Sequence, residues 1–276
     1  MFDFGFIGFG SMARMLIHSL IKYSNVKENS ICATRKDKEK LYEINGMFPG
    51  TKIYESCCDI AQNARVVFLC VKPAQIKGVL LEIRPFICAD THIVSIAGSV
   101  SLDNLQSIIP GKISKLIPTI TSQTGAGMSL LCHNANVTSG DVEFLERSIR
   151  PFGSVKIVKD SDIGFAAELT SCAPGFIASM FGHFVYAAAS HTTSFTFEEI
   201  SAMVNETLFA TAKLLSETDM SFEQVVSRVA TKGGITQEGV FVFNEALPQI
   251  FDEMFTKTLD KRRLAETKSN SDFSNE

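Results

Sequence analysis

The chain has 276 residues, of which 45% are hydrophobic and 20% are charged, and its formal net charge is −4 at pH 7. This length suits one large domain or two ordinary ones, and the acidic balance excludes the broad basic surface that binds nucleic acid. None of the seven cysteines forms a C-x-x-C pair and the five histidines show no metal-ligand spacing, which predicts reduced core thiols in a cytoplasmic protein without a metal site.

The first predicted elements are a strand near residues 3–7 and a helix over residues 11–24. The turn between them reads Gly8-Phe9-Gly10-Ser11-Met12-Ala13. Strand, glycine turn and helix in this order are typical of the dinucleotide-binding pattern G-x-G-x-x-G/A. Gly8 would make the tight turn, Gly10 would let the backbone approach a pyrophosphate at the helix N-terminus, and Ala13 would keep helix and strand close. The alternative is a glycine-rich turn that binds no ligand.

The second predicted strand, residues 30–34, ends where dinucleotide folds distinguish NAD from NADP. A carboxylate at this position would bind the ribose hydroxyls of NAD, but the sequence reads Thr34-Arg35-Lys36. Two cations without a carboxylate favour a 2′-phosphate, so we expect NADPH as the cofactor and NADH as its less favoured substitute. A solvated basic turn is the alternative interpretation.

Strands and helices continue to alternate up to about residue 160. We predict strands at 52–54, 65–71, 92–96, 112–117, 128–132 and 154–158, and helices at 37–42, 74–84, 101–109 and 141–149. This rhythm predicts an α/β fold with a Rossmann-type, doubly wound parallel sheet that binds ligands at the carboxyl ends of its strands. Further cofactor contacts are expected where two strands end, at Val71, Lys72, Pro73, Ala97 and Gly98.

Beyond residue 160 every predicted element is helical. A long helix spans residues 163–189, and capping boxes at Thr196 and Ser221 begin two more. After the break at Gly233-Gly234 a last helix runs from Thr236 to about residue 260. The domains are therefore predicted as residues 1–160 for NAD(P) binding, residues 161–264 for dimerisation and substrate, and residues 265–276 as a polar, disordered tail.

The helix at 163–189 is apolar on most sides and so has to be buried. A helical domain of roughly 100 residues has little interior, which favours an obligate homodimer through this domain and leaves a higher oligomer open. A membrane span is the competing interpretation. Because Glu168, Pro174, Gly175 and His183 interrupt the run, we expect no membrane segment.

Several of these motifs together resemble the pyrroline-5-carboxylate reductases, which catalyse the last step of proline biosynthesis. In chain order the motifs are the glycine turn, Val71-Lys72-Pro73, Ala97-Gly98, Pro118 with Gly125-x-Gly127-Met128, Ala173-Pro174, and the run V-A-T-K-G-G-I-T ending at Thr236. The resemblance implies a Rossmann-type domain, a helical dimerisation domain and an oxidoreductase that reduces 1-pyrroline-5-carboxylate with NADPH or NADH. By this resemblance Thr236 matches the threonine whose hydroxyl meets the ring nitrogen of the substrate, and Gly233 and Gly234 match the backbone that receives its carboxylate.

The residues agree with this chemistry. A cyclic imine is electrophilic at carbon once its nitrogen is protonated or hydrogen-bonded, so reduction needs a donor at nitrogen and a positioned nicotinamide. Free N–H groups after the Gly233-Gly234 break suit a carboxylate. Thr231 would flank this carboxylate site, and Ser171 and Cys172, just before a helix-interrupting proline, would line the other wall. The alternative is a helix–helix turn in which Thr236 is only the N-cap.

The substrate-side motifs depart from the family pattern. The family's S-P-G-G-T-T reads Thr231-Lys-Gly-Gly-Ile-Thr236 here, and its M-P-N-T-P reads Ile117-Pro-Thr-Ile-Thr121. This form resembles the ComER-type branch associated with late competence. The alternative to the reductase is therefore a catalytically weak or inactive, regulatory NADP-binding member of the same family. A β-hydroxyacid dehydrogenase is disfavoured, since it would carry a catalytic lysine between residues 160 and 212, where this chain has none.

Overall fold

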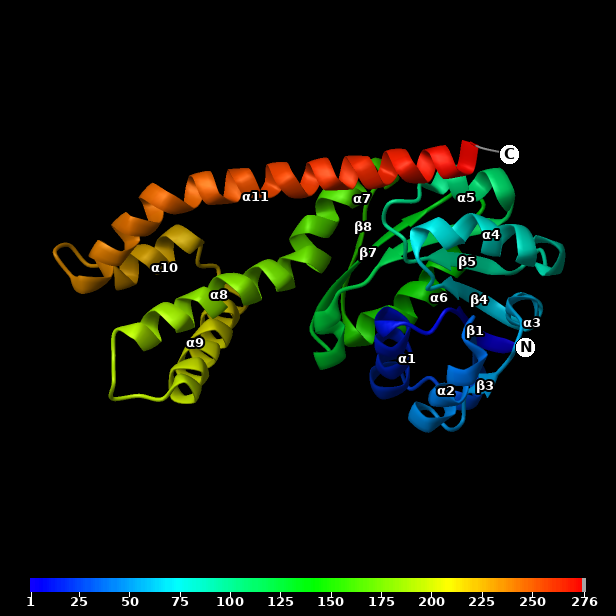
Figure 1. Ribbon diagram of the computed structural model, residues 1–276, viewed down its shortest axis with the longest axis horizontal. Helices are drawn as coiled ribbons and strands as arrows, with labels where there is room; N and C mark the ends of the chain where they lie inside the picture. The colour runs from blue at the N-terminus through cyan, green and yellow to red at the C-terminus, as the bar shows by residue number, and fades with distance from the viewer. Residues whose placement is uncertain (275–276) are drawn as a thin grey trace. The chain divides into compact units, whose positions relative to one another are not determined.

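The computed structural model describes residues 1–274, which form two compact units (Figure 1). The first unit contains Met1–Pro174 together with the chain from Asp260 onward, and the second contains Gly175–Leu259. This division does not follow the domain boundary predicted at residue 160. The reason is that Ile163 and Ala167, beyond that boundary, are buried in the core of the first unit.

The first unit is built on an eight-stranded sheet with strand order β3-β2-β1-β4-β5-β6-β7-β8. Its elements are β1 Phe2–Ile7, α1 Ser11–Ser24, β2 Ile31–Thr34, α2 Tyr42–Met47, β3 Lys52–Ile53, α3 Cys57–Asn63, β4 Ala64–Leu69, α4 Pro73–Ile83, β5 His92–Ser95, α5 Leu102–Ile108, β6 Lys112–Ile117, β7 Gly127–His133, α6 Ser139–Ile149 and β8 Gly153–Ile157. The predicted doubly wound α/β class is confirmed. Two local predictions are wrong: α3 was not predicted, and the helix expected at 37–42 is a short 3-10 turn followed by α2.

One strand departs from the predicted parallel sheet, because β7 pairs antiparallel with β6 while all other neighbours are parallel. A parallel return needs a crossover of about a dozen residues or more. The connection from Ile117 to Gly127 carries only a 3-10 turn, Ile120–Thr124, which is too short for a crossover and reverses the strand.

Alternation along the central strands divides the interior into two cores. Phe4 and Phe6 of β1 point into one core, with α1, α2 and α6, while Ile7 points into the other, with α3, α4 and α5. Both faces of the sheet are therefore covered by helices, as a doubly wound sheet requires. Phe6 stacks on Phe68 of β4 with ring centroids 4.8 Å apart, so the strands that carry the glycine turn are fixed at the centre of the fold.

The predicted long helix is observed as three consecutive segments. These are α7 Asp160–Ala167, a π turn Glu168–Cys172, and α8 Ala173–Ser190. Pro174 lacks the N–H that would continue the α-helical ladder. The chain accommodates it with the wider π turn instead of ending the helix, and such turns occur often at functional sites.

The predicted disordered tail, residues 265–276, is wrong for residues 265–274 and otherwise lies outside the described residues. Helix α11 runs without a break over Ile235–Ser274. Its last turns contact the first unit: Ser269 Oγ lies 3.3 Å from Ser99 Oγ, and Asn104 Nδ2 donates to Asn270 Oδ1 at 2.7 Å. Phe273 also packs on the core. These tertiary contacts outweigh the polar composition on which the prediction was based.

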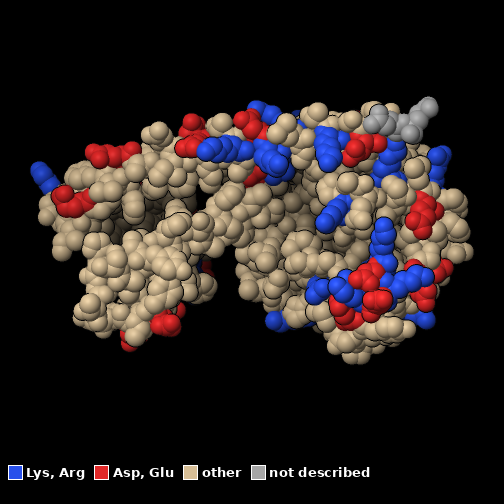
Figure 2. All heavy atoms as spheres, in the orientation of Figure 1, with Lys and Arg blue, Asp and Glu red and all other residues tan. Residues whose placement is uncertain are grey.

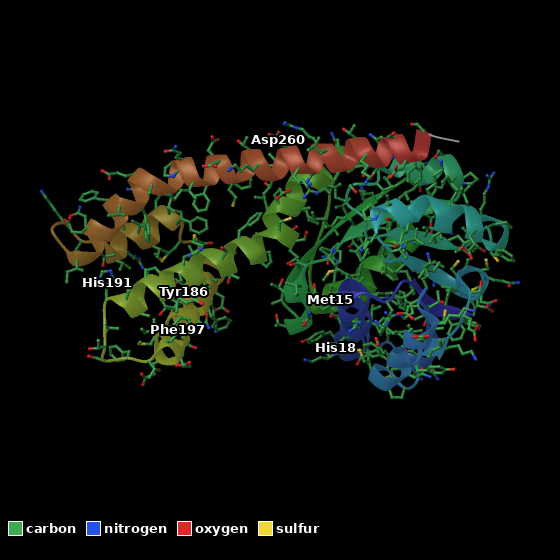
Figure 3. The ribbon with its side chains drawn as sticks, viewed as in Figure 1. Met15, His18, Tyr186, His191, Phe197 and Asp260 are labelled. Atoms are coloured by element: carbon green, nitrogen blue, oxygen red, sulfur yellow. The ribbon has the colours of Figure 1, made fainter. Side chains whose placement is uncertain are left out.

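The second unit consists of helices, among them α9 Phe197–Glu217 and α10 Phe222–Val229, and the predicted caps Thr196 and Ser221 begin these two helices. Among the described residues of this unit only Val185 and Ile200 are buried hydrophobics. Tyr186 and Phe197 make a ring contact at 5.1 Å (Figure 3). The exposed large side chains include Phe184, Met203, Phe209, Phe222, Phe241 and Ile250. Figure 2 shows few charges on the visible face of this unit.

One helical stretch of the described chain, Asp160–Ser190, is long and apolar enough to cross a membrane by length and composition. No Asp, Glu, Lys or Arg occurs from Leu169 to Phe197, but core helices of soluble proteins pass the same test of length and composition, so the expectation of no membrane segment stays a prediction. Its first turns are nevertheless held in a protein core through Ile163 and Ala167.

Candidate cofactor and substrate site

The glycine turn has the geometry of a phosphate-binding loop. Gly8 adopts φ 98°, its N–H donates to the Thr34 carbonyl at 3.0 Å, and an added Cβ would lie 2.6 Å from the Cys70 carbonyl oxygen. No other residue fits there without moving the backbone. Gly10 is the extended N-cap of α1 and makes no side-chain cap, which leaves the N–H groups of Ser11, Met12 and buried Ala13 for an anion.

A cavity of about 510 Å³ lies at the carboxyl ends of β1, β2 and β4, and we call it the carboxyl-edge cavity. Its volume is typical of a small-molecule site. Five predicted cofactor residues line it: Gly8, Thr34, Arg35, Lys36 and Val71. The sequence reasoning missed the residues from α3, α4 and the β3 loop, namely Glu55, Ser56, Cys57, Gln75, Gly78, Val79 and Glu82. Ser56 accepts the Cys58 N–H as the N-cap of α3, and a serine before a short apolar run was the available signal.

Charged side chains surround the end of β2. Arg35 Nη1 donates to Glu43 Oε2 at 2.9 Å, and Glu43 also lies 3.8 Å from Arg14 Nη2. The Arg35 side chain is only 17% exposed. Lys36 lines the cavity and has no ion pair among the described residues. Two cationic residues, Arg35 and Lys36, thus line the cavity, and positive side chains of this kind suit a phosphate dianion.

The turn after β4 is formed as expected. The Lys72 N–H donates to Gln75 Oε1 at 3.2 Å, and Pro73 is the first residue of α4. Proline suits this position because its missing N–H would have no helical partner. The turn is therefore held next to the carboxyl-edge cavity, which Val71 and Gln75 line.

The turn after β5 is fixed by a buried ion pair that the sequence reasoning did not predict. Lys115 is 2% exposed, and its Nζ lies 2.7 Å from Asp160 Oδ1 and 3.2 Å from the Gly98 carbonyl. The second oxygen of Asp160 accepts the Leu102 N–H at 2.8 Å. The Ala97 N–H is held by Ser95 Oγ at 3.2 Å. A lysine between Ile113 and Leu116, in the middle of a predicted strand, was the signal that could have identified this pair.

The π turn carries two of the predicted substrate residues, Ser171 and Cys172. The Ser171 hydroxyl donates within its own helix, to the Ala167 carbonyl at 3.5 Å. Beside it, Glu168 is 2% exposed and accepts from Arg262 Nε at 2.9 Å, and an Arg262 nitrogen lies 3.9 Å from Cys172 Sγ. Glu168 Oε2 is buried without a hydrogen-bond partner. Arg262 therefore ties α11 to the π turn.

The remaining predicted substrate residues meet in one bend of the second unit. Gly233 has φ 72° and its N–H donates to Gln237 Oε1 at 2.8 Å, while the Gly234 N–H donates to the Thr231 carbonyl at 2.9 Å. Thr236 lies exposed in the first turn of α11. The bend therefore presents a hydroxyl beside the first-turn N–H groups of α11, of which that of Gln237 donates to the Gly234 carbonyl at 3.1 Å. Ser171 and Cys172, in contrast, belong to the first unit.

Two thiols at the carboxyl-edge cavity and the strand end beside it, those of Cys57 and Cys70, have a raised pKa. Burial and the neighbouring Glu82 raise the pKa of Cys57 to about 12, and burial raises the pKa of Cys70. A protonated thiol is a poor nucleophile. The site is therefore suited to binding and orienting reactants, not to covalent catalysis by cysteine.

Two families match the chain, one in each half. Residues 3–99 match the family described as NADP oxidoreductase coenzyme F420-dependent, and residues 160–264 match pyrroline-5-carboxylate reductase dimerisation. The first match covers the glycine turn and the cations after β2. The second covers the π turn and the Gly233–Thr236 bend.

Similar proteins are found along nearly the full length of the chain. Pyrroline-5-carboxylate reductase 3 of Bacillus subtilis is 37% identical, covering 94% of this chain and 95% of the relative. ComE operon protein 4 of the same organism is 26% identical, and the match covers 92% of this chain and 93% of the relative. A pyrroline-5-carboxylate reductase of known structure from Coxiella burnetii is 26% identical in sequence. Its structure superposes with a TM-score of 0.84, and the match covers 95% of this chain and 98% of that chain.

Proposed function

The chain belongs to the pyrroline-5-carboxylate reductase family, and on that premise we propose that it is an oxidoreductase that reduces 1-pyrroline-5-carboxylate to proline with NADPH. The observation that carries this proposal is the carboxyl-edge cavity, where the strained Gly8 turn meets Arg35 and Lys36. The relative named as a reductase shares 37% of its residues and the competence-associated relative 26%, which favours the enzyme over a regulatory protein.

The residues of the cavity fit NADPH. The backbone at Gly8 leaves the space that a Cβ would fill, and the N–H groups of the first turn of α1 are available to the pyrophosphate. Arg35 and Lys36 supply the positive charge for a 2′-phosphate. When bound, NADPH supplies the hydride.

The protein has to position the imine and polarise its nitrogen. We assign the hydrogen bond to that nitrogen to Thr236, and the substrate carboxylate to the backbone at Gly233 and Gly234 with the neighbouring Thr231. On binding, the carboxylate would take the place of the Gln237 side-chain oxygen as the acceptor of the Gly233 N–H. A hydroxyl that bonds the nitrogen draws electron density from the imine carbon, where the hydride arrives. On the first unit, Ser171 and Cys172 are proposed as further substrate contacts, and Lys72, Pro73, Ala97 and Gly98 as contacts of the nicotinamide half of the cofactor.

The second unit is proposed to form a homodimer with a second copy of the chain. Only two buried hydrophobics serve a unit that exposes many large apolar side chains, and monomers rarely keep such surfaces exposed. A partner's helices would cover them. The seven cysteines are free, which agrees with a cytoplasmic enzyme.

The test is an absorbance assay with purified protein, NADPH and 1-pyrroline-5-carboxylate. NADPH should be consumed and proline formed. The Thr236→Ala variant should lower kcat/KM about ten- to hundredfold, which corresponds to a charge-assisted hydrogen bond of roughly 1.5–3 kcal/mol. Thr218→Ala, at the end of α9, is the matched control and should leave activity unchanged. If the folded protein binds NADPH but does not oxidise it when the imine is added, the regulatory function replaces the reductase.

A further inference from the structure

Two thiols and a carboxyl group gather on the wall of the carboxyl-edge cavity. Cys57 and Cys58 lie in the first turn of α3, and Glu82 lies on α4. Their ligand atoms, two sulfurs and a carboxylate oxygen, all lie within 4.8 Å of one another. Cys57 and Glu82 also line the cavity. The fold thus brings three metal-ligating groups together from two helices, and we call them the Cys57–Cys58–Glu82 cluster.

The backbone under the cluster is held in place. Ser56 Oγ accepts the Cys58 N–H at 3.1 Å, and Cys58 Sγ lies 3.6 Å from the Glu82 carbonyl oxygen. Beneath the cluster, Ile60 of α3 and Ile83 of α4 are completely buried in the same core. A cation would therefore require only side-chain adjustments, because the two helices are already fixed against each other.

We propose that Cys57, Cys58 and Glu82 bind a thiophilic divalent cation such as Zn²⁺ or Cd²⁺. Sulfur with a carboxylate oxygen is a donor set that zinc accepts, and three protein ligands leave a fourth coordination position open. The cysteines are half-buried and Glu82 is exposed, so the cation reaches them from solvent. Sequence spacing could not reveal this site, since Glu82 comes from a different helix and the two cysteines are adjacent.

The site has a consequence for the cofactor, which rests on the proposed function. Because Cys57 and Glu82 form part of the cavity wall, a cation between them, with the water in its fourth position, occupies space at the nucleotide's edge of the cavity. A bound cation therefore weakens the binding of NADPH, and NADPH weakens the binding of the cation by the same factor. The cluster makes cofactor binding sensitive to thiophilic metals.

The metal site is tested with Cd²⁺ alone, by titrating the full-length reduced protein and recording the thiolate-to-cadmium absorption band. One Cd²⁺ per chain should saturate the band, and Cys57→Ser and Cys58→Ser should each weaken binding at least tenfold. Cys88→Ser, which removes an exposed thiol elsewhere, is the control and should bind as the wild type does. Circular dichroism checks that each variant is folded. A wild type without the band, or variants that bind like it, would overturn the site.

The coupling is tested by measuring the Kd of NADPH with and without saturating Zn²⁺. We expect at least a fivefold weaker Kd with Zn²⁺ in the wild type and no effect of Zn²⁺ in Cys58→Ser. An unchanged wild-type Kd would overturn the coupling. Neither measurement uses the imine, so a protein that binds Cd²⁺ but fails to reduce 1-pyrroline-5-carboxylate would refute the proposed function alone.

Discussion

Replacing Arg35 by alanine should remove the preference for NADPH over NADH. Arg35 lines the carboxyl-edge cavity, and its side chain is 17% exposed. NADPH differs from NADH only by the 2′-phosphate, so a group that contacts this phosphate changes the binding of one cofactor and not of the other. The variant therefore isolates a single contact.

The size of the effect follows from the two interactions that Arg35 exchanges when NADPH binds, the ion pair with Glu43 and the hydrogen bond to the 2′-phosphate. A hydrogen bond between two charged groups contributes roughly 1.5–3 kcal/mol. Against this stands the ion pair with Glu43 at 2.9 Å, whose carboxylate is 47% exposed, so the pair is worth about 0–1 kcal/mol. The net loss of roughly 0.5–3 kcal/mol corresponds to about a two- to 150-fold higher Kd for NADPH. NADH binding should change less than about twofold.

The measurement is the quenching or enhancement of cofactor fluorescence as Arg35→Ala is titrated with NADPH and then with NADH. Arg150→Ala is the matched control, since Arg150 is also ion-paired, with Glu146 on α6, and it should bind both cofactors normally. Glu43→Gln should act in the opposite direction and lower the Kd of NADPH about two- to fivefold, because the phosphate no longer competes with a carboxylate. Equal changes for the two cofactors in Arg35→Ala would refute the assignment.

Two further predictions concern stability. Burial holds the pKa of His92 at about 4, below its ordinary 6.5. Between pH 4 and 6.5 the unfolded chain therefore binds more protons than the folded one. The contribution of neutral His92 to the free energy of unfolding is complete above pH 6.5, and at most roughly 3 kcal/mol is lost as the pH drops to 4. Denaturant titrations at pH 7.5 and 4.5 check this, and His92→Gln with the same pH dependence as the wild type would contradict it. Arg262→Ala leaves the Glu168 carboxylate, 2% exposed, without its cation and should lower the free energy of unfolding by about 3–5 kcal/mol. The double variant Arg262→Met/Glu168→Leu should recover most of this loss in urea titrations, and a loss below about 1 kcal/mol in Arg262→Ala would show that the pair is unimportant.

The nucleotide half of the site could be predicted because its signals are local. A strand that ends at Ile7, two glycines two residues apart and a helix that begins at Ser11 are all readable within a dozen residues. The cations after β2 are also local, since they follow the strand directly. Parallel strands bring such ends to one edge of the sheet, and the carboxyl-edge cavity confirms that Gly8, Thr34 and Arg35 share it.

The parts that were missed depend on residues far apart in the chain. Lys115 is neutralised by Asp160, and Cys57 meets Glu82, but neither pairing leaves a periodic pattern. Local composition even misled in one case, since the polar residues after 264 are helical because they pack on α5 and on the turn after β5. The π turn at Glu168–Cys172 likewise replaced the expected proline interruption.

The sequence by itself determined most of the strands and helices, that the fold is α/β with a glycine-rich turn after the first strand, and that the last third is helical. These follow from hydrophobic periodicity and from the backbone freedom of glycine, which act within a few residues. Tertiary structure alone decided the antiparallel β7, the helical C-terminal tail and the Lys115–Asp160 ion pair that fixes the turn after β5. The physical reason is that a buried ion pair or a packed polar helix depends on partners that only the folded chain supplies.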